Sequence, residues 1–272
     1  MASTGLPTVC FGKYEVSRLL LGHNPIKGIS HHTEQLDREM REWHADNGNV
    51  DTTLMRAEQC GINTAQFGGD VMHRAIERHT QQGGGLKWMA TLYGNEKGDL
   101  GVGLKLGIEE ELEAILAVRP RPLAIQHFGE KTDRLYFDGK LDLVRDRLKR
   151  FRDAGVLVGL CTHLPDVAME VESQGWDIDF FQTSLYTVYS RTGERAIDRE
   201  HEVFEDRDRD RMLDFVSQSS KQCIVFKLLA ANRKCHNDAS ISDTFALVFD
   251  RIKPTDVVCV GMWQKYRDQG GH

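Results

Sequence analysis

Eight short apolar runs recur along this chain, and amphipathic stretches of helical periodicity separate them. A short apolar run between turn signals indicates a buried strand, whereas apolar residues recurring every three or four positions indicate a helix with one buried face. Regular alternation of the two is typical of parallel β/α units. The predicted strands cover residues 18–22, 62–65, 87–92, 123–127, 156–162, 179–183, 223–227 and 256–260.

The number of β/α units predicts a single closed barrel. A short β-hairpin over residues 9–17 precedes the first unit, and no linker or low-complexity segment interrupts the 272 residues. A (β/α)8 TIM barrel takes roughly 250 residues, so we expect one such domain over residues 1–272. The rival, an open doubly wound sheet, needs a GxGxxG phosphate loop after its first strand. Gly22-His-Asn-Pro-Ile-Lys-Gly28 lacks that spacing.

Composition narrows the partners that we expect. The formal net charge is −6 and the pI is about 6.0, which argues against nucleic acid and anionic membrane, since both attract clustered Lys and Arg. No apolar run reaches the roughly 18 residues of a membrane span, and Met1 to Pro7 lack the blocks of a signal peptide. Six cysteines without a CxxC pair favour reduced thiols. We expect a cytoplasmic protein with a small-molecule substrate, and the oligomeric state stays open.

Histidines and a lysine follow several predicted strands. In a (β/α)8 barrel the active site forms at the carboxyl ends of the strands. His23, His127 and His163 and the lysine Lys227 all fall at such ends. Lys227 ends an otherwise apolar strand, where an unpaired buried charge is costly. The coincidence of four such groups at one predicted rim favours a functional role for the set.

These residue types support three interpretations. Imidazoles serve as general acid and base near neutral pH, and a lysine can form a Schiff base or stabilise an enolate or carboxylate. His23, His127 and His163 could instead ligate a divalent metal, completed by one of the acids Glu130, Asp133 and Asp166, although no HxH or HExxH pair supplies two ligands from one element. The structural alternative is that the histidines bond loop backbones and the lysine pairs with an acid at the rim.

Further polar residues near the predicted rim are candidates for contact with the substrate. Tyr186, Tyr189 and Arg191 lie on the long loop after the 179–183 strand, where they could line a polar pocket or simply pack the loop. Arg233 follows the 223–227 strand, in the region that often holds phosphate in such barrels. The predicted substrate-binding set is His23, Asn24, Asn63, Gln66, Tyr93, Tyr189, Arg191 and Arg233.

Three segments resemble the aldo-keto reductase superfamily. They are Val16-Ser-Arg-Leu-Leu-Leu-Gly22, Glu58-Gln-Cys-Gly-Ile-Asn-Thr-Ala65 and Leu123-Ala-Ile-Gln-His127. The resemblance covers most of the chain through short apolar motifs and implies a (β/α)8 barrel. It also implies NAD(P)-dependent carbonyl reduction by an aspartate, a tyrosine, a lysine and a histidine.

This chain departs from that catalytic set. Only His127 matches the histidine; the aspartate position is Asn63, the lysine position is Leu92, and the tyrosine region reads Gln66-Phe67-Gly68. Without a tyrosine as proton donor and a lysine beside it, ordinary carbonyl reduction loses its acid. The resemblance therefore supports the fold more than the activity.

We therefore expect an enzyme that acts on a small polar carbonyl- or sugar-like substrate by His/Lys acid–base or metal-assisted chemistry, of lyase, isomerase or hydrolase type. His127, His163, Lys227 and Tyr186 are the predicted catalytic groups. One alternative is an NAD(P)-dependent oxidoreductase of aldo-keto reductase type in which Tyr93 or Tyr186 is a rearranged proton donor. Another is a catalytically silent binding or regulatory barrel.

Overall fold

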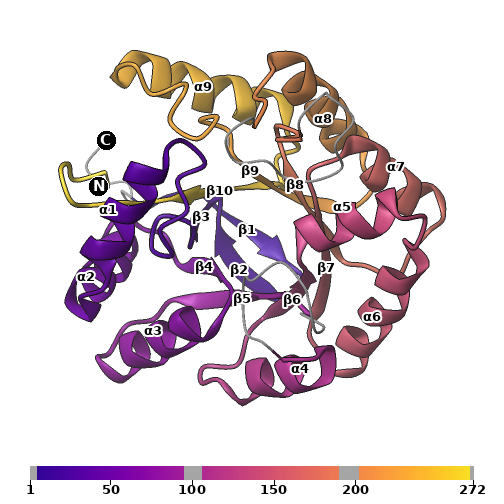
Figure 1. The fold of residues 1–272 in the computed structure, drawn as a ribbon, viewed down its shortest axis with the longest axis horizontal. Helices are drawn as coiled ribbons and strands as arrows, with labels where there is room; N and C mark the ends of the chain where they lie inside the picture. Colours follow the sequence, from indigo (N-terminus) through magenta and orange to yellow (C-terminus); the bar gives the residue numbers. More distant parts are fainter. Residues whose placement is uncertain (1–4, 95–105, 190–201, 270–272) are drawn as a thin grey trace. The chain divides into compact units, whose positions relative to one another are not determined.

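Eight parallel strands close into a barrel, which confirms the predicted (β/α)8 fold (Figure 1). The computed structural model describes residues 5–94, 106–189 and 202–269. The strand order around the barrel is β10-β3-β4-β5-β6-β7-β8-β9. The barrel strands are β3 Leu19–Gly22, β4 Thr64–Phe67, β5 Lys87–Leu92, β6 Ala124–His127, β7 Leu157–Thr162, β8 Phe180–Ser184, β9 Gln222–Phe226 and β10 Val257–Gly261.

The predicted N-terminal hairpin is also confirmed as a separate two-stranded antiparallel sheet of β1 (Thr8–Phe11) and β2 (Tyr14–Ser17). Gly12 takes a φ of 57° in the turn between them, a left-handed conformation that glycine adopts without steric cost.

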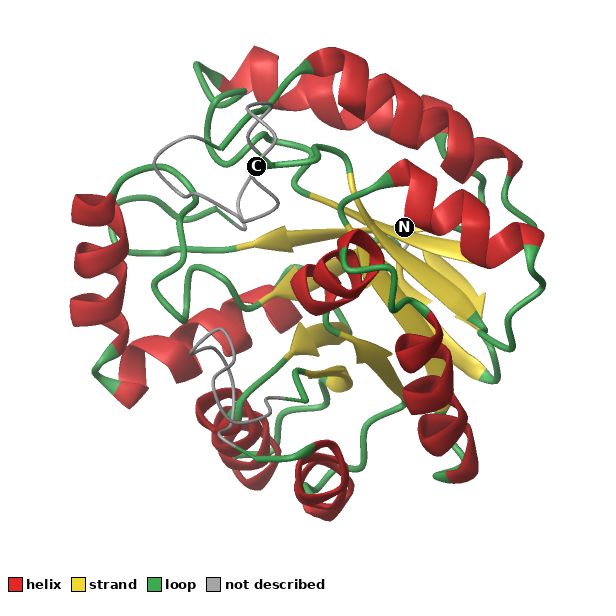
Figure 2. Cartoon of the chain, turned by 45° about the vertical axis from the view of Figure 1, so that its right-hand side comes forward, coloured by secondary structure: helices red, strands yellow, loops and turns green. Residues whose placement is uncertain are grey.

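Helices follow the strands as the periodicity predicted (red in Figure 2). They are α1 Glu34–His44, α2 Asn47–Gln59, α3 Asp70–Gln81, α4 Ile108–Ala117, α5 Gly129–Phe137, α6 Asp142–Asp153, α7 Pro165–Ser173, α8 Asp206–Gln218 and α9 Asp238–Arg251.

The helical periodicity of the sequence predicts helices over residues 52–60 and 242–252 and none over residues 129–137, and these three predictions need correction. Helix α2 begins at Asn47 rather than at residue 52, because the Asp46 side chain caps it by accepting the Gly48 N–H. Helix α9 begins at Asp238 rather than at 242, because Asn237 accepts the Ser240 N–H. Helix α5 was not predicted. An N-cap side chain that accepts an early helical N–H stabilises the start of a helix, which explains both early starts.

Strand β4 also differs from its prediction. It covers Thr64–Phe67 instead of residues 62–65. The Asn63 side chain precedes the strand, and its Oδ1 accepts the backbone N–H of Ser17 at 2.8 Å. The two-residue shift places Gln66 near the carboxyl end of β4 and Asn63 before its amino end.

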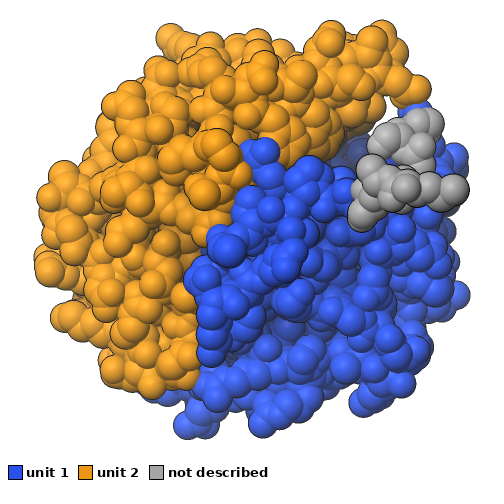
Figure 3. Space-filling view, turned by 180° about the vertical axis from the view of Figure 1, so that it is seen from behind, with its two compact units in different colours: residues 1–125, 259–272 blue, residues 126–258 orange. Residues whose placement is uncertain are grey.

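The chain forms two compact units, residues 1–125 with 259–272 and residues 126–258 (blue and orange in Figure 3). In residues 126–258, β7 pairs with β8 in a register that sets Gly159 beside Phe180. A Cβ on Gly159 would lie 2.1 Å from Cζ of Phe180. Glycine at this point therefore lets the Phe180 ring, which is 1% exposed, fill the space.

No helix of the described ranges has both the length and the apolar content needed to cross a membrane.

Candidate functional site

A tyrosine, a lysine and a histidine meet at the carboxyl ends of β3 and β5, all within residues 1–125. His23 follows Gly22, the last residue of β3, and Tyr93 follows Leu92, the last residue of β5. Lys27 Nζ donates a hydrogen bond to Tyr93 Oη at 2.8 Å, and Tyr93 Oη lies 3.4 Å from His23 Nε2. We call His23, Lys27 and Tyr93 the tyrosine cluster.

His23 is a neutral member of this cluster. Its Nδ1 lies 3.0 Å from the carbonyl oxygen of Gln66. Because a carbonyl can only accept, Nδ1 carries the proton and Nε2 presents its lone pair to Tyr93. Burial, and then the charge of Lys27, lower the pKa of His23 to about 3, so the ring is uncharged at neutral pH.

Lys27 reaches Tyr93 from the turn that follows β3. The Lys27 N–H bonds the His23 carbonyl at 3.0 Å, and its ammonium lies 4.7 Å from the centre of the Tyr93 ring. Burial lowers the pKa of Lys27 to about 8, although the carboxylates of Asp70 and Glu111 oppose this shift. Lys27 is therefore mostly protonated near pH 7, and it loses its charge only slightly above that.

Glu111 on α4 holds the backbone around Tyr93. One carboxylate oxygen accepts the Tyr93 N–H at 3.1 Å and the other accepts the Gly94 N–H at 2.7 Å. Burial raises the pKa of Glu111 to about 7 even though these two bonds lower it. Gly68 leaves room for the phenol, since a Cβ there would lie 2.8 Å from Tyr93 Oη. Glu111 on α4 and Gly68 after β4 thus help to position the Tyr93 hydroxyl.

The arrangement can move a proton at a substrate oxygen. A tyrosine hydroxyl serves as a general acid or base when it is placed within hydrogen-bond reach of the reacting group. A neighbouring cation favours the charge that the oxygen gains when it releases its proton. Lys27 is such a cation, and the neutral His23 ring adds no positive charge beside it.

A second cluster forms around Asp133 within residues 126–258. Asp133 lies on α5 and its side chain is 0% exposed. Its Oδ2 accepts from His163 Nδ1 at 2.8 Å, from the His163 N–H at 3.1 Å and from Tyr189 Oη at 2.6 Å. The Thr162 hydroxyl donates to Oδ1. We call Asp133, Thr162, His163 and Tyr189 the aspartate cluster.

His127 uses both of its ring nitrogens inside the fold. Nδ1 lies 2.8 Å from the hydroxyl of Thr132, and Nε2 lies 3.1 Å from Nη1 of Arg147 on α6. The side chain is fully buried. Burial, and then the charge of Arg147, lower the pKa of His127 to about 3. These contacts describe a histidine that joins the end of β6 to α6, and its predicted catalytic role stays a prediction.

Lys227 and Tyr186, the other predicted catalytic groups, are not among the hydrogen-bond donors to the Asp133 carboxylate. Lys227 follows β9 with a φ of 63°, and its Nζ lies 5.1 Å from the centre of the Phe226 ring. Tyr186 is 1% exposed and donates to Asp206 at 3.5 Å. Burial raises the pKa of Tyr186 to about 12. Of the two tyrosines considered as proton donors, only Tyr93 has a lysine bonded to its hydroxyl.

The predicted substrate-binding residues divide between the clusters and other places. His23 and Tyr93 belong to the tyrosine cluster, Gln66 contacts it through its carbonyl, and Tyr189 belongs to the aspartate cluster. Asn24 Nδ2 lies 3.4 Å from His31 Nε2. The Arg233 guanidinium lies 4.1 Å from the Phe204 ring. Asn63 bonds the hairpin, as described above, and Arg191 lies outside the described residues.

The predicted metal site of His23, His127 and His163 does not appear as a cluster of ligands among the described residues. Within residues 5–94, 106–189 and 202–269, no group of three or more His, Cys, Asp or Glu side chains could hold a metal ion. Both nitrogens of His127 are already hydrogen-bonded. Metal binding stays a prediction.

The sequence interpretation did not identify Lys27 or Glu111 as functional residues. Lys27 lies in Asn24-Pro25-Ile26-Lys27-Gly28, and the proline and glycine around it signal a tight turn directly after a strand end. Such a turn folds its side chains back over the strand end, which is the signal that could have indicated Lys27. Glu111 belongs to the run Glu109-Glu110-Glu111, which favours the first turn of a helix and gives no signal of a contact with residue 93.

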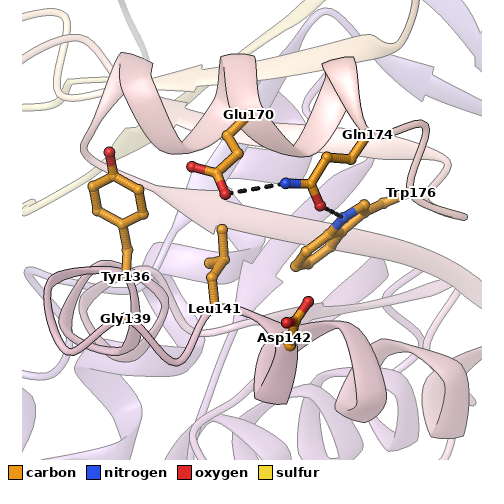
Figure 4. Close-up of a pocket in the computed structure, with 7 residues that line it drawn as sticks. All are labelled: Tyr136, Gly139, Leu141, Asp142, Glu170, Gln174 and Trp176. Carbon is orange, nitrogen blue, oxygen red and sulfur yellow. Dashed lines mark hydrogen bonds between the residues drawn. The ribbon is translucent and has the colours of Figure 1, made fainter.

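A cavity of about 290 Å³ in residues 126–258 is lined by no residue of either cluster (Figure 4). Trp176 Nε1 donates to Gln174 Oε1 at 2.9 Å, and Gln174 Nε2 donates to Glu170 Oε1 at 3.1 Å. Its polar groups thus partly satisfy one another. The lining residues are Tyr136, Gly139, Leu141, Asp142, Glu170, Gln174 and Trp176.

Comparison with known proteins identifies relatives of the fold. The sequence matches no family model and no curated protein. The structure is similar to the glycerol dehydrogenase AKR11B4 from Gluconobacter oxydans, an aldo-keto reductase, with a TM-score of 0.57 and 15% identity over 100% of this chain and 90% of that chain. It is also similar to an archaeal fructose-1,6-bisphosphate aldolase, with a TM-score of 0.51 and 12% identity over 93% and 89% of the two chains. At these identities the likeness shows the barrel fold alone.

Proposed function

We propose that this chain is an enzyme that interconverts a carbonyl and a carbinol group in a small polar substrate, with Tyr93 as the group that gives and takes the proton. The observation that carries the proposal is the 2.8 Å hydrogen bond from Lys27 Nζ to Tyr93 Oη. It supplies, from new positions in the chain, the tyrosine and lysine pair that the aldo-keto reductase resemblance lacked in sequence. The geometry thus favours an oxidoreductase over a lyase, isomerase or hydrolase at this cluster.

In this proposal Tyr93 transfers its proton to the substrate oxygen. The oxygen takes the place of His23 Nε2 as the acceptor for the phenol. The Lys27 ammonium stays bonded to Tyr93 Oη and stabilises the negative charge left on it. His23 remains neutral, because burial keeps its pKa near 3, and the lone pair on its Nε2 can only accept a hydrogen bond.

A nicotinamide cofactor, NAD(P), would supply the hydride for carbonyl reduction.

The test is a panel of small aldehydes, ketones and aldoses, assayed by the oxidation of NADPH and NADH. Tyr93→Phe is expected to lower kcat by about 10²- to 10⁴-fold, the usual contribution of a positioned general acid. Lys27→Met is expected to lower it in the same direction. Tyr136→Phe, which removes a hydroxyl from the cavity of Figure 4, is the matched control and should leave turnover unchanged.

Two outcomes would contradict parts of the proposal. Turnover in Tyr93→Phe within twofold of wild type would exclude the proton role of Tyr93. Incorporation of deuterium from D2O into a carbonyl substrate without any nicotinamide, followed by NMR and lost in Tyr93→Phe, would keep that role and replace the oxidoreductase by an isomerase.

A further inference from the structure

We propose that residues 126–258 carry a second site of proton transfer, in which His163 Nε2 takes a proton from water and so activates it to attack the acyl carbon of a small ester or lactone. The juxtaposition that carries this proposal is the hydrogen-bonded pair of Asp133 and His163 at the carboxyl end of β7. Every residue it uses lies in this one unit. It is therefore independent of the role of Tyr93.

Asp133 is the positioning residue of this site. Its carboxylate is 0% exposed and receives the four bonds of the aspartate cluster: two from His163, one from Tyr189 and one from Thr162. Burial, and then the nearby charge of Asp133, raise the pKa of Tyr189 well above its usual value, so Tyr189 stays a donor. A carboxylate held by this many donors cannot rotate without leaving buried polar groups unsatisfied.

The Asp133 carboxylate also decides which nitrogen of His163 is the base. Nδ1 lies 2.8 Å from Oδ2, so in the neutral ring Nδ1 carries the hydrogen and Nε2 carries the lone pair. A buried carboxylate plays the same part in hydrolytic triads, where it orients the imidazole and the opposite nitrogen takes the proton. Among the described residues His163 Nε2 has no hydrogen-bond partner, and the side chain is 7% exposed.

Packing fixes the ring in this orientation. The rings of Tyr189 and Phe226 lie edge-on to His163, with centres 6.1 and 5.6 Å away. A Cβ on Gly129, the first residue of α5, would lie 3.3 Å from Cε1 of His163 and 2.7 Å from Sγ of Cys161. The backbone of α5 therefore closes against the ring, and a larger residue at 129 would displace it. A base that is locked in place avoids the entropic cost of orientation at each turnover.

The cation of Lys227 indicates that the substrate gains negative charge during the reaction. Lys227 Nζ lies 5.1 Å from the centre of the Phe226 ring, and the centre of the His163 ring lies 5.6 Å from the same ring. A cation and a base thus neighbour the same aromatic ring. A cation near the reacting centre stabilises the oxyanion that forms when water adds to an acyl carbon. An ester or lactone is the substrate class that needs both groups.

The step conserves atoms and electrons without a co-reactant beyond water. Nε2 takes one proton from water while the water oxygen bonds to the acyl carbon. The bond from the acyl carbon to the leaving oxygen then breaks with its electron pair, and Nε2–H returns the proton to that oxygen. The products are a carboxylic acid and an alcohol, and the enzyme regains its starting state.

His127 provides an internal contrast. It is also buried at a strand end, but Thr132 and Arg147 occupy both of its nitrogens. No lone pair of that ring remains for water. The assignment therefore rests on how each ring is bonded rather than on the presence of a histidine at the rim.

The tautomer can be measured on the wild-type protein by long-range ¹H–¹⁵N NMR of its histidines, with the His163 signal assigned through His163→Gln. We expect the Nδ1–H tautomer for His163 in the neutral form of the wild-type protein and a larger share of the Nε2–H tautomer in Asp133→Asn, which lacks the carboxylate that accepts from Nδ1. An Nε2–H tautomer in wild type would overturn the proposal, because Nε2 would then hold no lone pair. This readout does not require either variant to be active.

Hydrolysis of p-nitrophenyl acetate tests the activity itself. We expect wild type to release p-nitrophenol faster than buffer, and His163→Gln to lose about 10²-fold or more of that rate. Asp133→Asn should lower the rate and move its pH profile, which loss of packing alone would not do. His236→Gln removes an exposed histidine of the same unit and should match wild type. Hydrolysis by wild type no faster than buffer, or by folded His163→Gln at the wild-type rate, would overturn the proposal.

Discussion

At the scale of single residues, the Tyr93 hydroxyl takes its properties from two neighbours of unlike character. Lys27 donates to it at 2.8 Å, and neutral His23 faces it at 3.4 Å. The Gln66 carbonyl fixes the tautomer of His23 at 3.0 Å. Because burial lowers the pKa of Lys27 to about 8, the charge beside Tyr93 is the part of the cluster that responds to pH near neutrality.

The first prediction concerns that charge. The Lys27 ammonium is present below about pH 8 and is lost as the pH rises through it, so kcat/KM for carbonyl reduction should decline above about pH 8. In Lys27→Arg the cation persists to much higher pH, and the decline should move out of this range. ¹³C-methylation of the lysines followed by NMR titration checks the Lys27 pKa directly. An unchanged decline in Lys27→Arg would assign it to another group.

At the scale of elements, helix α4 stabilises the end of strand β5 through one side chain. Glu111 in its first turn accepts the backbone N–H groups of Tyr93 and Gly94, at 3.1 and 2.7 Å. Loop backbone at a strand end has no ladder partner, so a side-chain acceptor replaces it. The helix therefore positions Tyr93, the tyrosine that we propose as the proton donor, as well as covering the barrel.

The second prediction follows from those two bonds. Glu111→Ala leaves two buried N–H groups without acceptors, and it should lower the free energy of unfolding by about 2–4 kcal/mol. Urea denaturation followed by circular dichroism measures this change. Glu113→Ala, at an exposed position of the same helix, is the control and should change stability by less than about 0.5 kcal/mol. Equal effects of the two variants would show that the Glu111 bonds contribute little.

At the scale of the whole molecule, burial holds at least three histidines of the described residues neutral. Burial is the first cause in each case, and it lowers the pKa of His23 to about 3, of His73 to about 4 and of His127 to about 3. Glu111 acts in the opposite sense, because its pKa is raised to about 7. Both units contain at least one such histidine, so acid affects each of them.

The third prediction is an acid-sensitive fold. Below about pH 6.5 the unfolded chain protonates these histidines and the folded chain does not, so stability present above that pH is lost as the pH falls toward 3–4. Each histidine contributes a slope of at most ~1.4 kcal/mol per pH unit, and Glu111, whose protonation stabilises the fold below its pKa, offsets about one of them. Urea unfolding at several pH values should therefore show a fall of about 2–3 kcal/mol per pH unit near pH 5.

A variant isolates one contribution to that slope. His127→Gln cannot take up a proton, so its stability should fall less steeply with acid, by up to ~1.4 kcal/mol per pH unit. Its stability at pH 7.5 is the reference for loss of packing. A slope identical to wild type would mean that His127 does not resist protonation in the folded chain.

Local patterns in the sequence were sufficient to predict the barrel fold. Apolar strand runs and helical periodicity predicted all eight barrel strands and the hairpin, because period and turn signals are properties of neighbouring residues. The observed boundaries differ from the predicted ones where a side chain bonds the backbone. Asp46 caps α2, and Asn63 accepts the Ser17 N–H before β4. Helix α5 escaped prediction although it is as long as α7, because α7 opens with Pro165, a signal of a helix start, whereas α5 opens with Gly129.

The sequence by itself also located the strand-end residues His23, Tyr93, His163 and Lys227. Only the tertiary structure decided their partners. Lys27 and Tyr93 are 66 residues apart, and Asp133 and His163 are 30 residues apart. Periodicity determines which residues face a core or a rim, but hydrogen bonds of 2.8 Å depend on how separate strand ends are brought together. The proposed proton chemistry depends on those distances and on burial, which the sequence alone does not give.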